Sequence, residues 1–117
     1  IRDSRYGVRK SKERIEEALA RVKEVWHQAE MEVSPTNDWH MLGLCIDLKN
    51  MTQCADIYYN ACLTRTETRG WHYREDFPKR DDTNWRKWID IKQKDGKVLI
   101  STENLPIERY KTKPDAV

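Results

Sequence analysis

Long apolar runs are absent from this sequence. None approaches the roughly 20 residues that a membrane-spanning helix requires, and no basic start with an apolar middle and a small-residue cleavage site marks a signal peptide. A large excess of one charge is also absent, because 22 basic residues accompany 20 acidic residues and the formal net charge is +2. Such a chain produces no strong long-range field toward nucleic acid or an anionic membrane. We therefore expect no membrane insertion and no nucleic-acid partner.

Motifs that bind metals or dinucleotides are missing as well. The cysteines form no C-x-x-C pair, the histidines form no H-x-x-x-H pair, and no G-x-G-x-x-G turn follows an expected strand. We therefore predict no metal site. The cysteines are odd in number and free cysteines are usually buried, so we predict reduced, buried thiols in a cytoplasmic setting. These residues are Cys45, Cys54 and Cys62, with His27, His40 and His72 as the histidines.

Aromatic residues and helical periodicity indicate one folded domain over residues 1–117. Five Trp and five Tyr are more than a disordered chain usually carries, and 117 residues suffice for a single hydrophobic core. Apolar residues recur at spacings of three and four between Ile15 and Ala29. This pattern predicts a helix over about residues 11–32, with Ser11 as its N-cap.

Two further helices are expected after Pro35, which interrupts the helical pattern. No proline occurs within residues 39–66, so helical structure can resume there. The sequence Asn50-Met51-Thr52-Gln53 has the form of a capping box. The stretch is therefore either one long bent helix or two helices, and the capping box favours two, over about residues 38–49 and 51–68.

A loop and a β-hairpin are expected after the third helix. Gly70 suits the left-handed conformation that closes a helix, so we expect it to end that helix. Proline and turn-forming residues then predict an ordered loop over residues 70–84. Asp95 and Gly96 suit a type I′ turn between β-forming segments, which predicts a hairpin over about residues 85–103. The pattern is mainly α, with three helices and a C-terminal β-hairpin.

The densest mixture of charged and aromatic residues lies between Thr66 and Trp85. It reads T-E-T-R-G-W-H-Y-R-E-D-F-P over residues 66–78 and R-D-D-T-N-W over residues 80–85. Arginines, carboxylates and aromatic rings alternate here, as a network of bidentate ion pairs between a loop and a helix requires. A purely structural role is the simpler interpretation, because paired charges beside aromatic rings usually hold geometry and do not react.

These two runs resemble the signature E-S-R-G-x-H-x-R-x-D-[FY]-P followed by R-D-D-x-N-W of the C-terminal domain of fumarate reductase and succinate dehydrogenase flavoproteins. Relatives of that family include L-aspartate oxidase and the adenylylsulfate reductase alpha subunit. Residues 7–9 and 48–51 are similar to the family too, so the likeness covers nearly the whole chain. The resemblance implies an up-down-up three-helix bundle, like a spectrin repeat, with a small β-element. Because the sequence starts at Ile1, we also expect it to belong to a longer chain.

The resemblance implies a domain that packs on a flavin domain and is not catalytic alone. In the family, the residues that contact the flavin, bind the dicarboxylate and move protons lie mainly in the preceding FAD-binding and capping domains. Those domains are the expected partners, with FAD as the cofactor of the parent protein and an iron–sulfur subunit as a further partner. A place at the cytoplasmic face of a membrane complex is left open. The motif residues expected to shape the docking contact are Arg69, Gly70, His72, Arg74, Asp76, Arg80, Asp81, Asp82 and Trp85.

Two departures from the family pattern leave the substrate of the parent enzyme open. Trp71 replaces the small residue that is common after R-G in the family. Trp88 occupies the position where the family often has a histidine after N-W-L-K. If the docking interpretation is correct, we expect Trp71, Trp85 and Trp88 to be exposed when the partner domain is absent.

Two other functions remain open from the residues alone. Cations alternate with tryptophans over residues 65–88, as they do in modules that bind single-stranded nucleic acid. Five acidic residues in the same window would repel a phosphate backbone and oppose this function. The second alternative is a helical protein-interaction module without a redox role.

Overall fold

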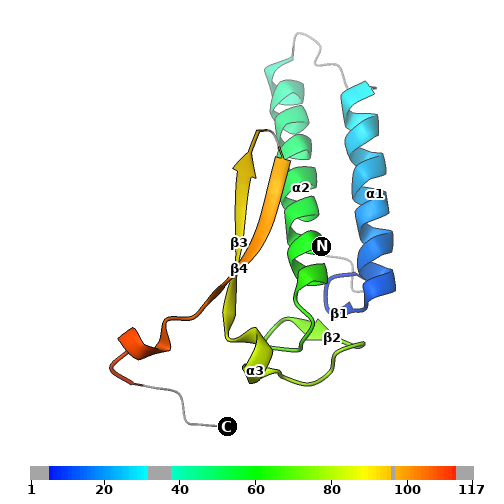
Figure 1. The fold of residues 1–117 in the computed structure, drawn as a ribbon. Helices are drawn as coiled ribbons and strands as arrows, with labels where there is room; N and C mark the ends of the chain where they lie inside the picture. The colour runs from blue at the N-terminus through cyan, green and yellow to red at the C-terminus, as the bar shows by residue number, and fades with distance from the viewer. Residues whose placement is uncertain (1–5, 32–37, 96, 113–117) are drawn as a thin grey trace.

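The computed structural model describes residues 6–31, 38–95 and 97–112, and the molecule is elongated, measuring 60 × 30 × 24 Å. Two long antiparallel helices, α1 (Lys12–Met31) and α2 (Trp39–Thr64), lie side by side (Figure 1). The helix predicted over residues 11–32 is therefore confirmed. The Ser11 hydroxyl oxygen accepts a hydrogen bond from the Arg14 backbone amide at 3.4 Å, as expected for its N-cap position.

The hydrophobic core is small and lies where the start of α1 faces the end of α2. Its buried members are Ile15, Ala18, Tyr59 and Cys62. Cys62 is buried as predicted, whereas Cys45 is half-buried and Cys54 is exposed, so the prediction of buried thiols is wrong for these two. The physical reason is that α1 covers only one side of α2, which leaves residues on its other sides open to solvent.

The predicted break at Asn50 is wrong, because α2 continues without interruption from Trp39 to Thr64. Asn50 is exposed inside the helix and not at its N-cap. The Thr52 hydroxyl donates to the carbonyl oxygens of Leu48 and Lys49, at 3.0 and 2.9 Å, so it is satisfied within the helix. Asparagine lowers helix propensity only modestly, and packing of α2 along α1 outweighs this local preference.

A continuous α2 changes the predicted architecture. The helices predicted over residues 38–49 and 51–68 are one element, which removes the reversal of chain direction between them. The third helix, α3 (Asp82–Trp85), is a single turn inside the region predicted as a loop over residues 70–84. The described residues therefore form a helix pair with a short third helix, and not an up-down-up three-helix bundle. The mainly helical class with a β-hairpin is confirmed.

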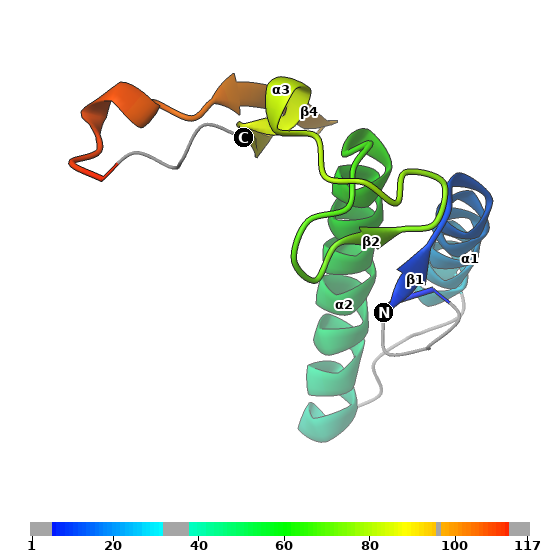
Figure 2. The ribbon, with the colours of Figure 1, turned by 90° about the horizontal axis from the view of Figure 1, so that it is seen from below.

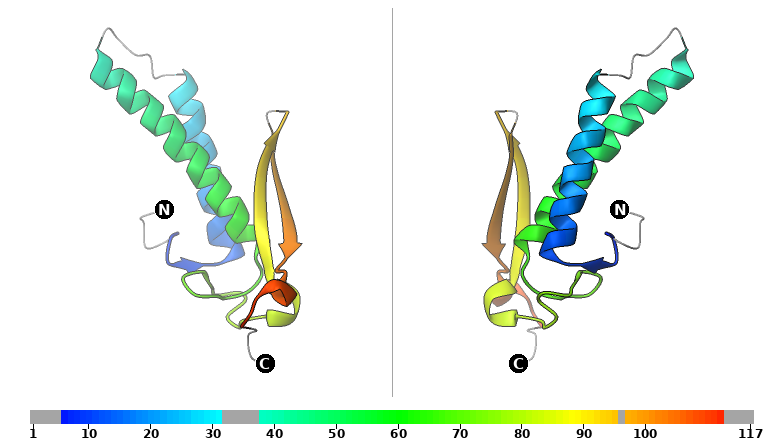
Figure 3. Two further views of the ribbon diagram at one scale, coloured as in Figure 1. Left: turned by 90° about the vertical axis from the view of Figure 1, so that its left-hand side faces the viewer. Right: turned by 90° about the vertical axis from the view of Figure 1, so that its right-hand side faces the viewer.

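The predicted hairpin is present. β3 (Lys87–Lys94) and β4 (Lys97–Asn104) are antiparallel, and Lys94 pairs with Lys97 across a two-residue turn. Asp95 has a φ of 52°, the positive value that a type I′ turn requires; Gly96 lies outside the described residues. Figure 3 shows the hairpin and the helix pair meeting at one end and diverging toward the other. The segment at that shared end therefore decides how the two parts are held together.

Two short strands at this end fix residues 65–81, the segment between α2 and α3 that we call the motif loop, to the start of α1. β1 (Arg9–Lys10) pairs in parallel with β2 (Tyr73–Arg74), below the helix pair in Figure 1 and in front of it in Figure 2. The Glu75 amide then donates to the Lys10 carbonyl at 2.7 Å. A short 3-10 helix, η1 (Ile107–Arg109), follows the hairpin. The sequence pattern predicted none of these three elements, which are too short to produce a periodic signal.

Candidate docking site

Arg74 joins the motif loop to the C-terminal end of α2. Its side chain is 1% exposed, and its guanidinium donates to the carbonyl oxygens of Cys62 at 2.7 Å and Arg65 at 3.2 Å. Carbonyl groups at this end of a helix have no partner within the helix, and a cation is favourable beside them because of the helix dipole. Arg74 therefore caps α2 from a loop that follows it in the chain.

Asp76 connects this cap to the N-terminal end of α1. Its carboxylate accepts two hydrogen bonds of 2.7 Å from the Arg74 guanidinium and one of 2.9 Å from the Lys12 backbone amide. The bonds from Arg74 are the main cause that lowers the pKa of Asp76 from 3.8 to about 2; partial burial opposes them, and the Lys12 amide adds to them. One side-chain pair thus holds the ends of both long helices.

Glu67 is the centre of a second network. Its side chain is 0% exposed, and its carboxylate accepts hydrogen bonds from Arg65 at 2.6 Å, Arg69 at 2.7 and 3.0 Å, and the Asp81 amide at 2.9 Å. Burial alone would raise the pKa of Glu67, but these bonds, led by those from Arg69, outweigh burial and lower it. Glu67 is therefore held as an anion and does not act as a proton donor near neutral pH.

Asp82 extends this network toward the surface. Its Oδ1 atom accepts hydrogen bonds from Arg69 and from Arg80, the latter at 2.8 Å, and the bonds from Arg80 and then Arg69 lower the pKa of Asp82. Asp81 is the N-cap of α3, because its carboxylate accepts from the backbone and side-chain nitrogens of Asn84, both at 2.9 Å. The two carboxylates therefore fix the position of α3.

Trp85, the last residue of α3, is held against the segment that follows α2. Its indole nitrogen donates to the Thr66 hydroxyl at 2.9 Å, and the Arg65 guanidinium lies 5.0 Å from its ring centroid. Arg65 also donates to the Lys87 carbonyl at 2.8 Å. These contacts join the end of α2 to the base of the hairpin.

Gly70 and Trp71 are the central residues of a tight turn in the motif loop. The amides and carbonyls of Arg69 and His72 bond reciprocally across it, both at 2.9 Å. Gly70 has a φ of 54°, and Trp71 is not among the described residues with positive φ, which is the pattern of a type II′ turn. The predicted role of Gly70 as the end of the helix is therefore wrong, because α2 ends at Thr64. Its positive φ serves this later turn instead.

Trp71 is 100% exposed at this turn, and Trp88 is 44% exposed, as the docking interpretation predicts. The same prediction is wrong for Trp85, which is half-buried because its indole is engaged by Thr66 and Arg65. An indole presented fully to solvent on a turn closed by two backbone hydrogen bonds is unusual for a residue of this size. The turn is therefore a candidate contact point for another protein surface.

His72 lies beneath the turn and is half-buried. Its Nε2 atom is 3.3 Å from the Arg65 carbonyl oxygen, so the neutral ring donates a hydrogen bond there when Nε2 carries the proton. Burial is the main cause that lowers the pKa of His72 below 6.5; the Arg65 carbonyl opposes it, and the charge of Lys10 adds to it. The ring is therefore neutral at pH 7 and supports the turn.

The charged side chains of the predicted motif divide mainly between two structural networks. Arg74 and Asp76 form the first, and Arg69, Arg80 and Asp82 belong to the second. Sequence reasoning missed the residue at the centre of the second network, Glu67, and its partner Arg65. The available signal was the alternation Arg65-x-Glu67-x-Arg69, because alternate residues of an extended segment lie on the same side. Reasoning also missed Lys10, which is 2% exposed with its ammonium 5.9 Å from the Tyr58 ring centroid.

The described residues do not form a cradle for a dinucleotide. Only Ser11 separates β1 from α1, so the strand-to-helix turn lacks the glycines that let a backbone approach a pyrophosphate. The described parallel strands have two residues each, too few for a dinucleotide-binding sheet. Within residues 6–31, 38–95 and 97–112, no helix combines the length and the apolar character needed to cross a bilayer.

Comparison with known sequences gives a consistent result. The family profile described as fumarate reductase flavoprotein C-term matches residues 1–116. The fumarate reductase flavoprotein subunit of Helicobacter pylori is 29% identical over 98% of this chain and 17% of its own length. The succinate dehydrogenase flavoprotein subunit of Bacillus subtilis is 30% identical over 67% of this chain and 13% of its own length. The chain therefore spans less than a fifth of the length of these relatives.

Solved structures share the fold. A variant of FrdA from E. coli quinol fumarate reductase superposes with a TM-score of 0.78 and 21% identity, over 95% of this chain and 20% of that one. The apo Sdh1 complex of Mycobacterium smegmatis gives a TM-score of 0.72 and 28% identity, over 86% of this chain and 18% of that one. Since the family profile matches nearly every residue, the chain belongs to the fumarate reductase flavoprotein C-terminal family.

Proposed function

We propose that this chain packs on the FAD-binding and capping domains of a parent oxidoreductase of the fumarate reductase and succinate dehydrogenase type, and that it performs no redox chemistry alone. Family membership supports this proposal, as does the fact that the chain matches only 17% and 13% of two flavoprotein subunits. The remaining length of such proteins is ample for a flavin domain. FAD, an iron–sulfur subunit and a cytoplasmic location remain predictions for the parent protein.

The observation that carries the docking role is the fully exposed indole of Trp71 on a closed turn of the motif loop. Tyr73 and Phe77 lie in the same loop and are 39% and 40% exposed. We call these three side chains the motif surface. Exposed aromatic residues are typical of protein interfaces, where they supply large apolar contact area with little loss of conformational entropy.

The charged residues of the motif loop support this surface and do not react. The Arg74 guanidinium donates its hydrogen bonds to Asp76 and to carbonyl groups at the end of α2. The Glu67 carboxylate accepts hydrogen bonds from two arginines and one backbone amide. Side chains committed in this way fix the backbone from which Trp71 projects. Because these arginines are already paired, they also supply little free charge for the phosphates of a nucleic acid. Domain docking is therefore better supported than nucleic-acid binding.

The test is to produce the 117-residue chain and the preceding flavin-containing part of the parent as separate polypeptides. We expect them to associate, which size-exclusion chromatography detects as flavin absorbance that elutes with both chains. Trp71→Ala should weaken association about thirtyfold, because truncating an interface anchor costs about 2 kcal/mol.

Trp39→Ala is the matched control. Trp39 is 85% exposed but lies at the start of α2, outside the motif surface, so this variant should bind like the unmodified chain. Failure of the two polypeptides to associate would refute docking. Equal losses in the two variants would show that the motif surface is not the contact.

A further inference from the structure

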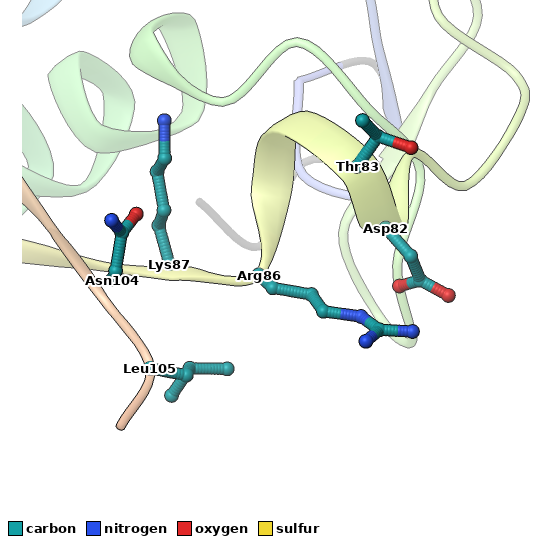
Figure 4. Close-up of a pocket in the computed structure, with 6 residues that line it drawn as sticks. All are labelled: Asp82, Thr83, Arg86, Lys87, Asn104 and Leu105. Atoms are coloured by element: carbon teal, nitrogen blue, oxygen red, sulfur yellow. The ribbon is translucent and has the colours of Figure 1, made fainter. Parts of the chain in front are cut away.

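A polar hollow lies between α3 and the base of the hairpin, apart from the motif surface. It encloses about 450 Å³ and is lined by Asp82, Thr83, Arg86, Lys87, Asn104 and Leu105. A second hollow of about 310 Å³ shares Asp82, Arg86 and Leu105 and continues to Arg69, Arg80 and Tyr110. We call the two together the Arg86 basin. Figure 4 shows Arg86 extending along α3 toward Asp82, whereas Lys87 leaves the chain on the other side.

The cations of this basin exceed the acids that could neutralise them. Among the described residues, neither the Arg86 guanidinium nor the Lys87 ammonium forms a hydrogen bond or ion pair, although both side chains belong to half-buried residues. Arg69 and Arg80 both donate to the same oxygen, Oδ1 of Asp82. Asp82 is therefore shared by two arginines, and the third guanidinium beside it, that of Arg86, has no ion-pair partner in the part of the chain that the structure describes.

An unpaired guanidinium that has lost part of its water is unfavourable unless an anion replaces that water. Arg86 has a planar fork of five N–H donors, which matches the two oxygens of a carboxylate. Thr83 and Asn104 bring a hydroxyl and an amide to the same walls. Asp82 repels an incoming anion, but its charge is already engaged by Arg69 and Arg80. The basin is therefore suited to one additional negative group.

We propose that the Arg86 basin binds the carboxylate of an aspartate or glutamate side chain from the flavin-containing part of the parent protein. This inference rests on the proposed docking function. A side-chain carboxylate fits better than a free ion, because Leu105 and Ile107 add apolar wall that can contact the methylene groups of an incoming side chain. The basin would then supply an ion pair that orients the domain while the motif surface supplies apolar contact.

The test has two arms, and the first uses the full 117-residue chain alone with acetate as a mimic of the side chain. NMR of the arginine Nε–H groups should show a saturable shift for Arg86 when acetate replaces chloride at constant ionic strength. Lys94→Gln removes a cation from the far end of the hairpin and should leave this shift unchanged. Absence of a saturable shift at Arg86 would count against a carboxylate site.

The second arm measures association with the flavin-containing part. Arg86→Gln should weaken it on the order of tenfold at low salt, as expected for losing hydrogen bonds to a charged group, and should reduce its salt dependence; Lys94→Gln should do neither. If the unmodified chain associates and Arg86→Gln binds equally well, the basin proposal is overturned while docking stands. If the unmodified chain does not associate, both proposals fail.

Discussion

The bridge formed by Asp76 gives the sharpest quantitative prediction. Its carboxylate binds the Arg74 guanidinium, which caps α2, and the Lys12 amide at the start of α1. Asp76→Asn keeps the shape of the side chain but removes the negative charge. The substitution therefore asks how much the charge of a single carboxylate stabilises the junction between the two long helices.

The magnitude follows from the pKa of Asp76, which is 3.8 before folding and about 2 in the folded chain. Each pKa unit corresponds to about 1.4 kcal/mol, so the upper limit is roughly 2.5 kcal/mol. The side chain remains 28% exposed, and water screens part of the interaction. We therefore expect Asp76→Asn to lower the free energy of unfolding by about 1–2 kcal/mol at pH 7.

The pH dependence provides a second, independent check. Because folding lowers the pKa of Asp76, the unfolded chain binds the proton more tightly, and the stabilisation is complete above pH 3.8. It is lost as the pH falls through about 2. The difference in unfolding free energy between the unmodified chain and Asp76→Asn should therefore shrink across that range. Urea denaturation followed by circular dichroism at several pH values measures it.

Asp47→Asn is the matched control, because Asp47 is exposed on α2 and has no ion pair among the described residues. It should change the unfolding free energy by less than about 0.5 kcal/mol. The reasoning would be refuted if Asp76→Asn and Asp47→Asn had equal effects. A difference for Asp76→Asn that stayed constant from pH 7 to below 2 would refute the electrostatic explanation in particular.

Three further substitutions test other parts of the fold, each by urea denaturation. Glu67→Gln should lower the free energy of unfolding by about 3 kcal/mol or more, because it leaves Arg65 and Arg69 without a buried counter-charge. A loss under about 1 kcal/mol would show that the ion pairs of Glu67 do not stabilise the fold. Gly70→Ala should cost about 1 kcal/mol from its φ of 54° alone, since an added Cβ meets no atom within 4 Å; no loss would show that the turn relaxes freely. Asn50→Ala should stabilise the chain by about 0.5 kcal/mol within a continuous helix, whereas a loss of about 1 kcal/mol would indicate the N-cap that the structure lacks.

The long helices and the hairpin turn were accessible to sequence reasoning because their signals are local. The spacing of apolar residues gave α1 to within one residue at each end, and Asp95 has the positive φ that its dipeptide suggested. The error at Asn50 has the same origin. The capping pattern at Asn50 is a local signal that favours a helix start. Packing of α2 along α1 keeps the helix continuous there, and that packing involves residues far apart in the chain.

The motif of residues 66–85 shows the same contrast between local sequence signals and contacts of distant residues. Its composition was enough to predict ion pairs between a loop and a helix, and its letters carried the resemblance to a family. Pairs two residues apart, such as Glu67 with Arg69 and Arg74 with Asp76, have a spacing that could suggest them, but the contacts between distant residues have no such local signal. Asp82 is 13 residues from Arg69, and Asp76 is 64 from Lys12. Only the folded loop brings those groups within hydrogen-bond distance.

By itself the sequence determined the helical class, the start of α1, the hairpin and the family to which the chain is similar, because periodicity, caps, turn dipeptides and motifs are encoded by neighbouring residues. The tertiary structure alone decided that α2 is unbroken, that Glu67 is buried at the centre of a network, and that the Arg86 guanidinium forms no ion pair among the described residues. Burial and ion pairing depend on which distant segments meet, and no local pattern specifies that.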